Sequence, residues 1–241
     1  LGLFNAADNA TLAGGSWQSS LPLANLKTRL ISERARSTNA ALASTLFTVD
    51  LGEVYPLVGV LALAGHNLSA AAKIRVRGHS TNSFTSPTYD SGWLPVWTGT
   101  ANTALGSVEW ESEFFWNYAI SDNEKKYFPG LAAVFPGQNL RYWQIEIDDT
   151  TNGVGFVEIG RLFIGKLWTP EHNASYGWGI GYEDKTEISE SLGMAEFFDA
   201  RPLYRVLRFG LDYMTSREAI ADILGIQASH GISGDILVFF D

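Results

Sequence analysis

The sequence has no cysteine among its 241 residues, so it can form neither a disulfide framework nor a thiolate metal site. Positive charge is also scarce: 17 Lys and Arg stand against 26 Asp and Glu, and the net charge is -9. A protein that follows a nucleic-acid backbone needs a basic surface, so we expect no nucleic-acid partner. No run of eighteen apolar residues occurs, and we therefore expect no membrane insertion.

The usual catalytic and metal-binding motifs are missing as well. The four histidines are scattered and never take the spacing of a zinc site. No Gly-x-Ser-x-Gly elbow and no phosphate-binding Gly-x-x-x-x-Gly-Lys loop is present. We accordingly predict no catalytic residue, no metal site and no cofactor, and we expect that the protein is not an enzyme.

Paired carboxylates keep one enzymatic alternative open, since two of them can suffice for glycoside hydrolysis. Glu109, Glu111 and Glu113 alternate and would share one face of a strand, while Asp148-Asp149 and Glu183-Asp184 are further pairs. Carboxylates are, however, the ordinary solvated residues of an acidic protein, and Asp148 to Gly153 has the composition of a turn. An enzyme that acts on polysaccharide is therefore the third hypothesis.

Two segments carry the strongest structural signal, because each alternates apolar and polar residues as a half-buried strand does. The first is Phe47 to Glu53, which contains Asp50-Leu51-Gly52, and the second is Arg141 to Ile147, followed by Phe156 to Gly165. Together they resemble the opening and closing strands of galactose-binding-like domains of the discoidin, or coagulation factor 5/8 type C, family. The resemblance implies a mainly β jelly-roll sandwich that binds a ligand. The alternation places Val49, Leu51, Ile145, Ile147 and Ile164 in its core.

The pattern along the chain predicts an N-terminal arm at 1–15, the sandwich at 16–168 and a smaller β-rich module at 169–241. Residues 107–140 are interpreted as an insertion in the sandwich. The module should contain one helix at about 216–229, because Thr215 and Glu218 form a capping-box pattern before apolar residues at helical spacing. Gly177, Gly179 and Gly181 alternate with bulky residues there, which is typical of strands that another backbone approaches closely.

Aromatic residues supply the candidate sites. Tyr89, Asp90, Trp93 and Trp97 lie in a segment rich in Gly, Ser and Pro, where rings could stack on a glycan; alternatively, the tryptophans close one end of the sandwich. A denser aromatic group is interpreted as a protein interface: Trp110, Phe114, Phe115 and Trp116.

A sandwich followed by a strand, helix and strand module resembles tail-tip or baseplate (minor tail) proteins of long-tailed bacteriophages. This resemblance implies a structural protein of the virion that assembles with copies of itself and with other tail proteins, and that contacts host surface glycans. The alternative is a carbohydrate-binding module, free-standing or appended to an enzyme.

Overall fold

The computed structural model describes residues 1–97, 130–201, 203–231 and 234–238, and it divides into two compact units. Unit 1 comprises Leu1–Trp168 and the chain from Asp235 on, and unit 2 is Thr169–Gly234. The sequence analysis had placed the residues after 234 in the C-terminal module. Leu237 instead exchanges two backbone hydrogen bonds with Gly2, of 2.8 and 3.1 Å, because its strand-like run completes the edge of the sheet in unit 1.

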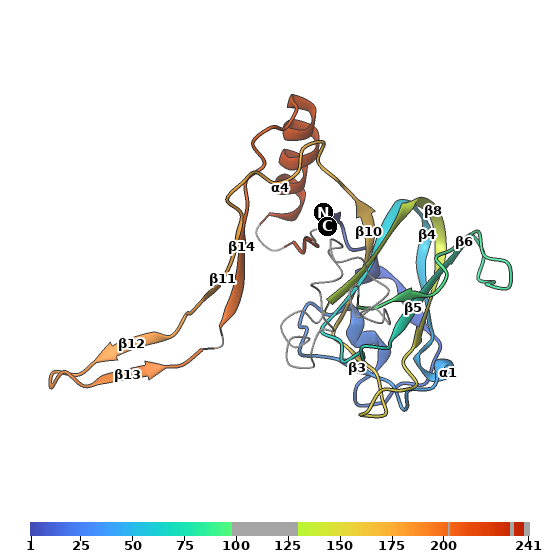
Figure 1. Ribbon diagram of the computed structural model, residues 1–241, viewed down its shortest axis with the longest axis horizontal. Coiled ribbons are helices and arrows are strands. Elements are labelled where there is room, and N and C mark those ends of the chain that lie inside the picture. The colour runs from blue at the N-terminus through green and yellow to red at the C-terminus, as the bar shows by residue number, and fades with distance from the viewer. Residues whose placement is uncertain (98–129, 202, 232–233, 239–241) are drawn as a thin grey trace, which may run out of the picture. The chain divides into compact units, whose positions relative to one another are not determined.

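Unit 1 is built on an antiparallel sheet whose strands are ordered β1-β10-β4-β8-β5-β6, with β2 also on β4 and β7 also on β5 (Figure 1). Its strands are β1 (Gly2–Leu3), β2 (Thr11–Ala13), β4 (Phe47–Ala64), β5 (Lys73–His79), β6 (Tyr89–Asp90), β7 (Leu94–Pro95), β8 (Gly130–Asp148) and β10 (Arg161–Leu167). A separate pair joins β3 (Ala35–Arg36) to β9 (Glu158–Ile159). Short helices η1 (Ala6–Asn9), η2 (Leu23–Lys27) and α1 (Leu42–Thr45) lie in the connections.

The two longest strands, β4 and β8, each belong to both layers of the sandwich. The first part of β4 pairs with β2 and with the end of β8, whereas its last part pairs with β10 and with the start of β8. The register between them shifts from Asp50 to Val60, which marks the bulges at which strands pass from one sheet to the next. Gly52 permits the bend with a φ of 81°, and its N–H donates to Asp50 at 2.8 Å. The motif Asp50-Leu51-Gly52 therefore begins the bend at which β4 passes from one layer to the other.

One hydrophobic core is shared by both layers, as a sandwich requires. Its large fully buried side chains come from β4, β5, β8, β9, β10 and η2, and the largest are Trp143, Phe47, Leu26, Leu61, Leu63 and Ile74. Val49, Ile145, Ile147 and Ile164 are buried as predicted, and Leu51 is partly buried against the same core. The prediction of a mainly β chain with an antiparallel sheet is confirmed.

The insertion expected at 107–140 is wrong at its C-terminal end. Residues 130–140 belong to β8 and place Leu131, Phe135 and Leu140 in the core. The Pro136-Gly137 pair lies where the register of β4 and β8 is irregular, and proline is compatible with a strand at such a bulge.

Unit 2 contains two successive strand pairs and one helical segment in its described residues. β11 (Gly179–Glu183) pairs with β14 (Tyr204–Arg208), and β12 (Glu187–Glu190) pairs with β13 (Glu196–Asp199). The helical segment joins η3 (Glu218–Ile223) to α4 (Leu224–His230). It begins with the predicted capping box, since the Thr215 N–H donates to the Glu218 carboxylate at 2.9 Å and the Glu218 N–H donates to Thr215 Oγ1 at 3.3 Å. No described helix is both long and apolar enough to cross a membrane.

Candidate polar pocket

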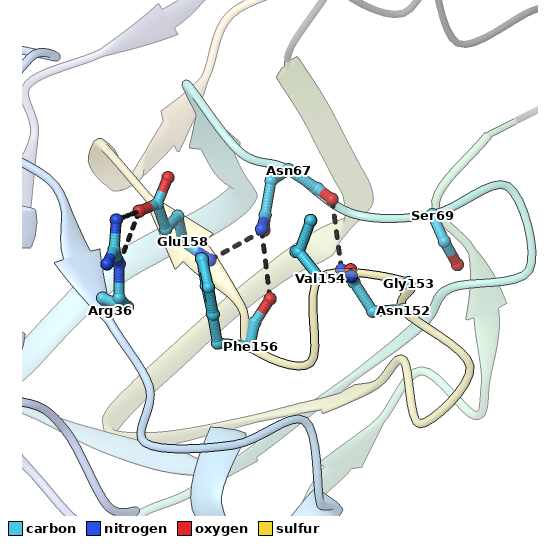
Figure 2. A pocket seen from close by; sticks show the side chains of 8 residues that line it. All are labelled: Arg36, Asn67, Ser69, Asn152, Gly153, Val154, Phe156 and Glu158. Carbon is cyan, nitrogen blue, oxygen red and sulfur yellow. Dashed lines mark hydrogen bonds and ion pairs between the residues drawn. The ribbon is translucent and has the colours of Figure 1, made fainter.

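A pocket of about 450 Å³ opens on unit 1 where three segments meet (Figure 2). One is β3, one is the loop that follows β4, and one is the loop between β8 and β9. Its lining residues are Arg36, Asn67, Ser69, Asn152, Gly153, Val154, Phe156 and Glu158. Most of them are polar, and the volume falls in the range of small-molecule sites.

An ion pair between neighbouring strands forms one wall of the pocket. Arg36 on β3 stands opposite Glu158 on β9, so both side chains project from the same face of this strand pair. Arg36 Nε donates to Glu158 Oε1 at 2.6 Å, and Arg34 Nη1 donates to Oε2 at 3.0 Å. Burial opposes ionisation of Glu158, but the hydrogen bonds from Arg36 and Arg34 outweigh it and hold the pKa of the carboxyl below its usual value. Glu158 is therefore a fixed carboxylate at neutral pH.

An aromatic ring lies against the same ion pair. The guanidinium carbon of Arg36 is 4.4 Å from the centre of the Phe156 ring, which is a cation–π contact. The ring is partly exposed, and the neighbouring Val154 is exposed on the rim. A planar charged group, a carboxylate and an apolar surface are thus adjacent.

Asn67 connects the loop after β4 to this wall. Its Nδ2 donates to the Phe156 carbonyl at 3.1 Å, and its Oδ1 accepts from the Glu158 N–H at 2.7 Å (Figure 2). Its own carbonyl accepts from Asn152 Nδ2 at 3.2 Å. Asn67 therefore forms hydrogen bonds with the Phe156–Glu158 wall and with Asn152 on the opposite loop.

A buried carboxylate, Asp149, holds the two loops together beneath the pocket. It is 1% exposed and accepts from the Ser69 N–H at 3.0 Å, from the Ser69 hydroxyl, and from Asn152 Nδ2 at 2.7 Å. The Asn152 Oδ1 accepts from the Val154 N–H at 3.1 Å, which shapes the rim. These bonds leave the pocket pre-formed, so a ligand would not have to order it.

A buried histidine supports the loop after β4 from the core side. His66 Nδ1 accepts from the Leu68 N–H at 3.3 Å, and the ring makes an edge contact with Trp97 at 5.5 Å between centroids. Burial lowers the pKa of His66 to about 4, so the ring is neutral at physiological pH. Across the part of the chain that the structure describes, no group of three or more His, Asp and Glu side chains could hold a metal ion.

The four residues predicted to bind a glycan do not form one surface. Trp97 is buried in the core, where its Nε1 donates to the Leu68 carbonyl at 3.3 Å, so its ring is not available to stack on a sugar. Tyr89 stacks on Phe135 at 4.8 Å between centroids, and Asp90 is ion-paired with Arg75. Trp93 alone keeps an exposed ring. For Trp97 the structure favours the alternative interpretation, in which it closes the sandwich.

Other predicted residues lie outside the described ranges, namely the interface group Trp110, Phe114, Phe115 and Trp116 and the carboxylates Glu109, Glu111 and Glu113. Of the remaining carboxylate pairs, Asp149 is engaged in the loop contacts above and Glu183 accepts from Tyr204 and Arg208. The polar pocket itself was not predicted.

Comparisons with known proteins give likenesses to solved structures only. No protein-family model matches the sequence, and neither does any curated protein. Among solved structures, the chain is similar to a Streptococcus pneumoniae fucose binding module, with 11% identity and a TM-score of 0.45 over 68% of this chain and 96% of that one.

Two further solved structures show the same degree of likeness. The lectin domain of lectinolysin complexed with Lewis B antigen has 12% identity and a TM-score of 0.44 over 70% of this chain and 100% of that chain. CBM32-1 from a family 31 glycoside hydrolase of Clostridium perfringens has 12% identity and a TM-score of 0.42 over 67% and 97%. At TM-scores below 0.5, these likenesses do not assign the chain to a family.

Proposed function

We propose that the protein is a carbohydrate-binding module that holds a saccharide in the polar pocket of unit 1 without chemically altering it. The observation that carries the proposal is the wall formed by Arg36, Glu158 and Phe156. A saccharide offers hydroxyl groups that both donate and accept, together with apolar C–H faces. A fixed carboxylate, a guanidinium and an aromatic ring within one pocket match those features.

The pocket retains bonding capacity for such a ligand. Arg36 uses Nε and Nη2 on Glu158, and within the described residues no hydrogen bond occupies its Nη1. Glu158 Oε2, which accepts from Arg34 Nη1, can accept a further hydrogen bond, and Ser69 Oγ, which donates to Asp149, can still accept. Val154 and Phe156 would cover an apolar sugar face. The resemblance of the sequence to galactose-binding-like domains supports the same function.

The test is a binding screen with a matched control. The purified full chain is titrated calorimetrically with neutral hexoses, 6-deoxyhexoses, N-acetylhexosamines and uronic acids. We expect millimolar or tighter binding of at least one sugar, and a loss of about 10-fold or more in Arg36→Ala, because a hydrogen bond that involves a charged group contributes about 1.5–3 kcal/mol.

Arg141→Ala is the control, since Arg141 makes the same kind of contacts on another surface of unit 1. It forms a forked ion pair with Asp50, at 2.6 and 2.8 Å, and its guanidinium lies 4.8 Å from the centre of the Tyr142 ring. Binding should be unchanged in this variant. Absence of binding to every sugar, or equal loss in both variants, would contradict the proposal.

A structural role in a phage tail tip or baseplate is the second proposal, and with it the virion as the location. It is supported by the sequence resemblance and by the exposed apolar side chains of unit 2, which are unusual for a free module. No comparison points to a phage. Tape-measure or tail-tube genes beside the gene for this chain would support this role, and a chain that stays monomeric and joins no other protein would count against it.

A further inference from the structure

The four strands of unit 2 form an extended ribbon, and most of its residues are exposed to solvent. We call β11 and β14 its inner pair, and β12, β13 and the turn between them its outer hairpin (Figure 1). Every residue of β12 and β13 is exposed. A two-stranded hairpin with both faces in water is marginally stable by itself. Contacts beyond those among the four strands would therefore stabilise it.

Large apolar side chains lie on both faces of the outer hairpin. Ile188 stands opposite Phe198 on one face, and Phe197 lies on the other, with exposures of 63%, 61% and 61%. Leu192 and Met194 project from the turn and are fully or mostly exposed. Contiguous exposed apolar groups of this kind mark an interaction surface.

The charges divide the ribbon into two parts of opposite sign. The outer hairpin carries Glu187, Glu190, Glu196 and Asp199 and no Lys or Arg. Glu190 stands directly opposite Glu196, and no described cation pairs with either, although like charges at this position destabilise a hairpin. The inner pair and its flanking residues carry an excess of cations, with Lys185, Arg201, Arg205 and Arg208 against Glu183 and Asp184. Within the chain, Arg201 pairs with Glu187 and Asp199, and Arg208 pairs with Glu183, which leaves Glu190 and Glu196 as the carboxylates of the outer hairpin that a second copy would neutralise.

Glycines remove the side chains of β11 from part of one face of the inner pair. Gly179 and Gly181 share a face of β11, opposite Arg208 and Val206. Neither has a positive φ, and a Cβ added at either would meet no atom within 4 Å. The fold of the single chain therefore does not require glycine there. Glycine within a strand commonly marks a close approach by another backbone.

We propose that the ribbon pairs with the ribbon of a second copy of this chain, running antiparallel to it. In this arrangement the acidic outer hairpin of each copy lies against the cationic, glycine-bearing inner pair of the other. The contact is self-complementary, as a two-fold interface requires, and it forms twice. It neutralises Glu190 and Glu196 and covers the exposed phenylalanines. An anionic lipid surface would instead repel the four carboxylates.

Charge reversal on the full chain tests the arrangement. The acid-reversed variant is Glu190→Lys with Glu196→Lys, and the base-reversed variant is Arg205→Glu with Arg208→Glu. Mass in solution, measured by light scattering after size exclusion, should be twice the 26.4 kDa of one chain for the wild type. Each variant alone should be monomeric, with its dissociation constant raised about 100-fold or more, because like charges then face each other at both contacts.

Mixing the two variants should restore the dimer, since Lys then faces Glu at one contact and Glu faces Arg at the other. Restoration also separates a lost interface from a lost fold, because unfolded chains would not reassociate; circular dichroism of each variant gives a second check. Glu33→Lys with Glu53→Lys is the matched control, as both side chains are exposed on unit 1, and it should remain dimeric. A monomeric wild type, dimers that survive both reversals, or a mixture that stays monomeric would overturn the proposal. None of these outcomes depends on sugar binding.

Discussion

The sandwich of unit 1 and the ribbon of unit 2 use the same alternation of apolar and polar residues to different ends. In β5 of the sandwich, Ile74 and Val76 are buried against neighbouring strands. In β11 of the ribbon, Ile180 and Tyr182 also recur at every second residue, yet they are exposed. A strand pattern therefore shows that one face of the strand can be buried. Whether that face is buried within one chain depends on whether the chain also supplies a second layer to pack against it.

The largest expected contrast between the regions is the effect of removing a phenylalanine. Phe47 is fully buried and makes an edge contact with Trp17 at 5.9 Å, so Phe47→Ala should lower the free energy of unfolding by about 3–5 kcal/mol. Phe198→Ala in the ribbon should change it by less than about 0.5 kcal/mol, because no described layer packs on that side chain. Urea unfolding at a protein concentration at which the chain is monomeric measures both. Equal losses would mean that a single chain covers the ribbon.

A smaller contrast is expected between two aspartates that both bind loop backbone. Asp149 is buried and accepts from the Ser69 N–H and from Asn152, so Asp149→Ala leaves buried donors without partners and should cost about 1–3 kcal/mol. Hydrogen exchange should accelerate in the loop after β4, and sugar binding should weaken with it.

Asp184→Ala is the matched change in unit 2. Asp184 accepts from the Thr186 N–H at 2.8 Å and from its hydroxyl at 2.6 Å, but it is exposed to water, which replaces both bonds. Its substitution should leave global stability unchanged. If the two variants were equally stable, Asp149 would not be the connection between the pocket loops.

Most of the sandwich could be predicted because its strands follow local rules. In residues 73–79, Ile74 and Val76 alternate with basic residues, a strand pattern, and the segment forms β5. The segments at 46–51 and 57–65 read as two separate strands in the sequence, whereas the structure has one, β4, because the backbone stays paired through the bulges after Gly52. Alternation is a local signal, but continuity through a bulge depends on the partner strand.

The pocket could not be predicted because its residues meet only in three dimensions. Arg36 and Glu158 are 122 residues apart in the sequence, and pairing of β3 with β9 brings them together. Arg36 lies among arginines interleaved with other residues, a pattern typical of a solvated face, and Glu158 lies in a strand pattern, so neither residue indicates a site by itself. The available signal was the Asn, Asp and Ser content of two loops, which identifies turns and not a shared site. The aromatic segment was more conspicuous, yet it contributes Trp97 to the core.

The smallest effect that we expect concerns the ion pairs of the two regions and their dependence on pH. The Arg75 hydrogen bond is the main cause that lowers the pKa of Asp90 from 3.8 to about 2, and the Gly92 N–H adds to it against a small opposing effect of burial. Because the folded-state pKa lies below the unfolded one, the stabilisation is complete above pH 3.8 and disappears as the pH falls to about 2.

Asp90→Asn should therefore lower the free energy of unfolding by about 1 kcal/mol or less at pH 7, since the pair is partly exposed, and the difference from wild type should vanish near pH 2. Glu183→Gln removes the partner of Arg208 in the ribbon, where the arginine is largely exposed, and should leave stability unchanged throughout. Unfolding of the three proteins at a series of pH values measures the contrast. A pH-independent loss in Asp90→Asn would assign the role of Asp90 to its uncharged hydrogen bonds, and an equal loss in Glu183→Gln would mean that the ribbon is held as firmly as the sandwich.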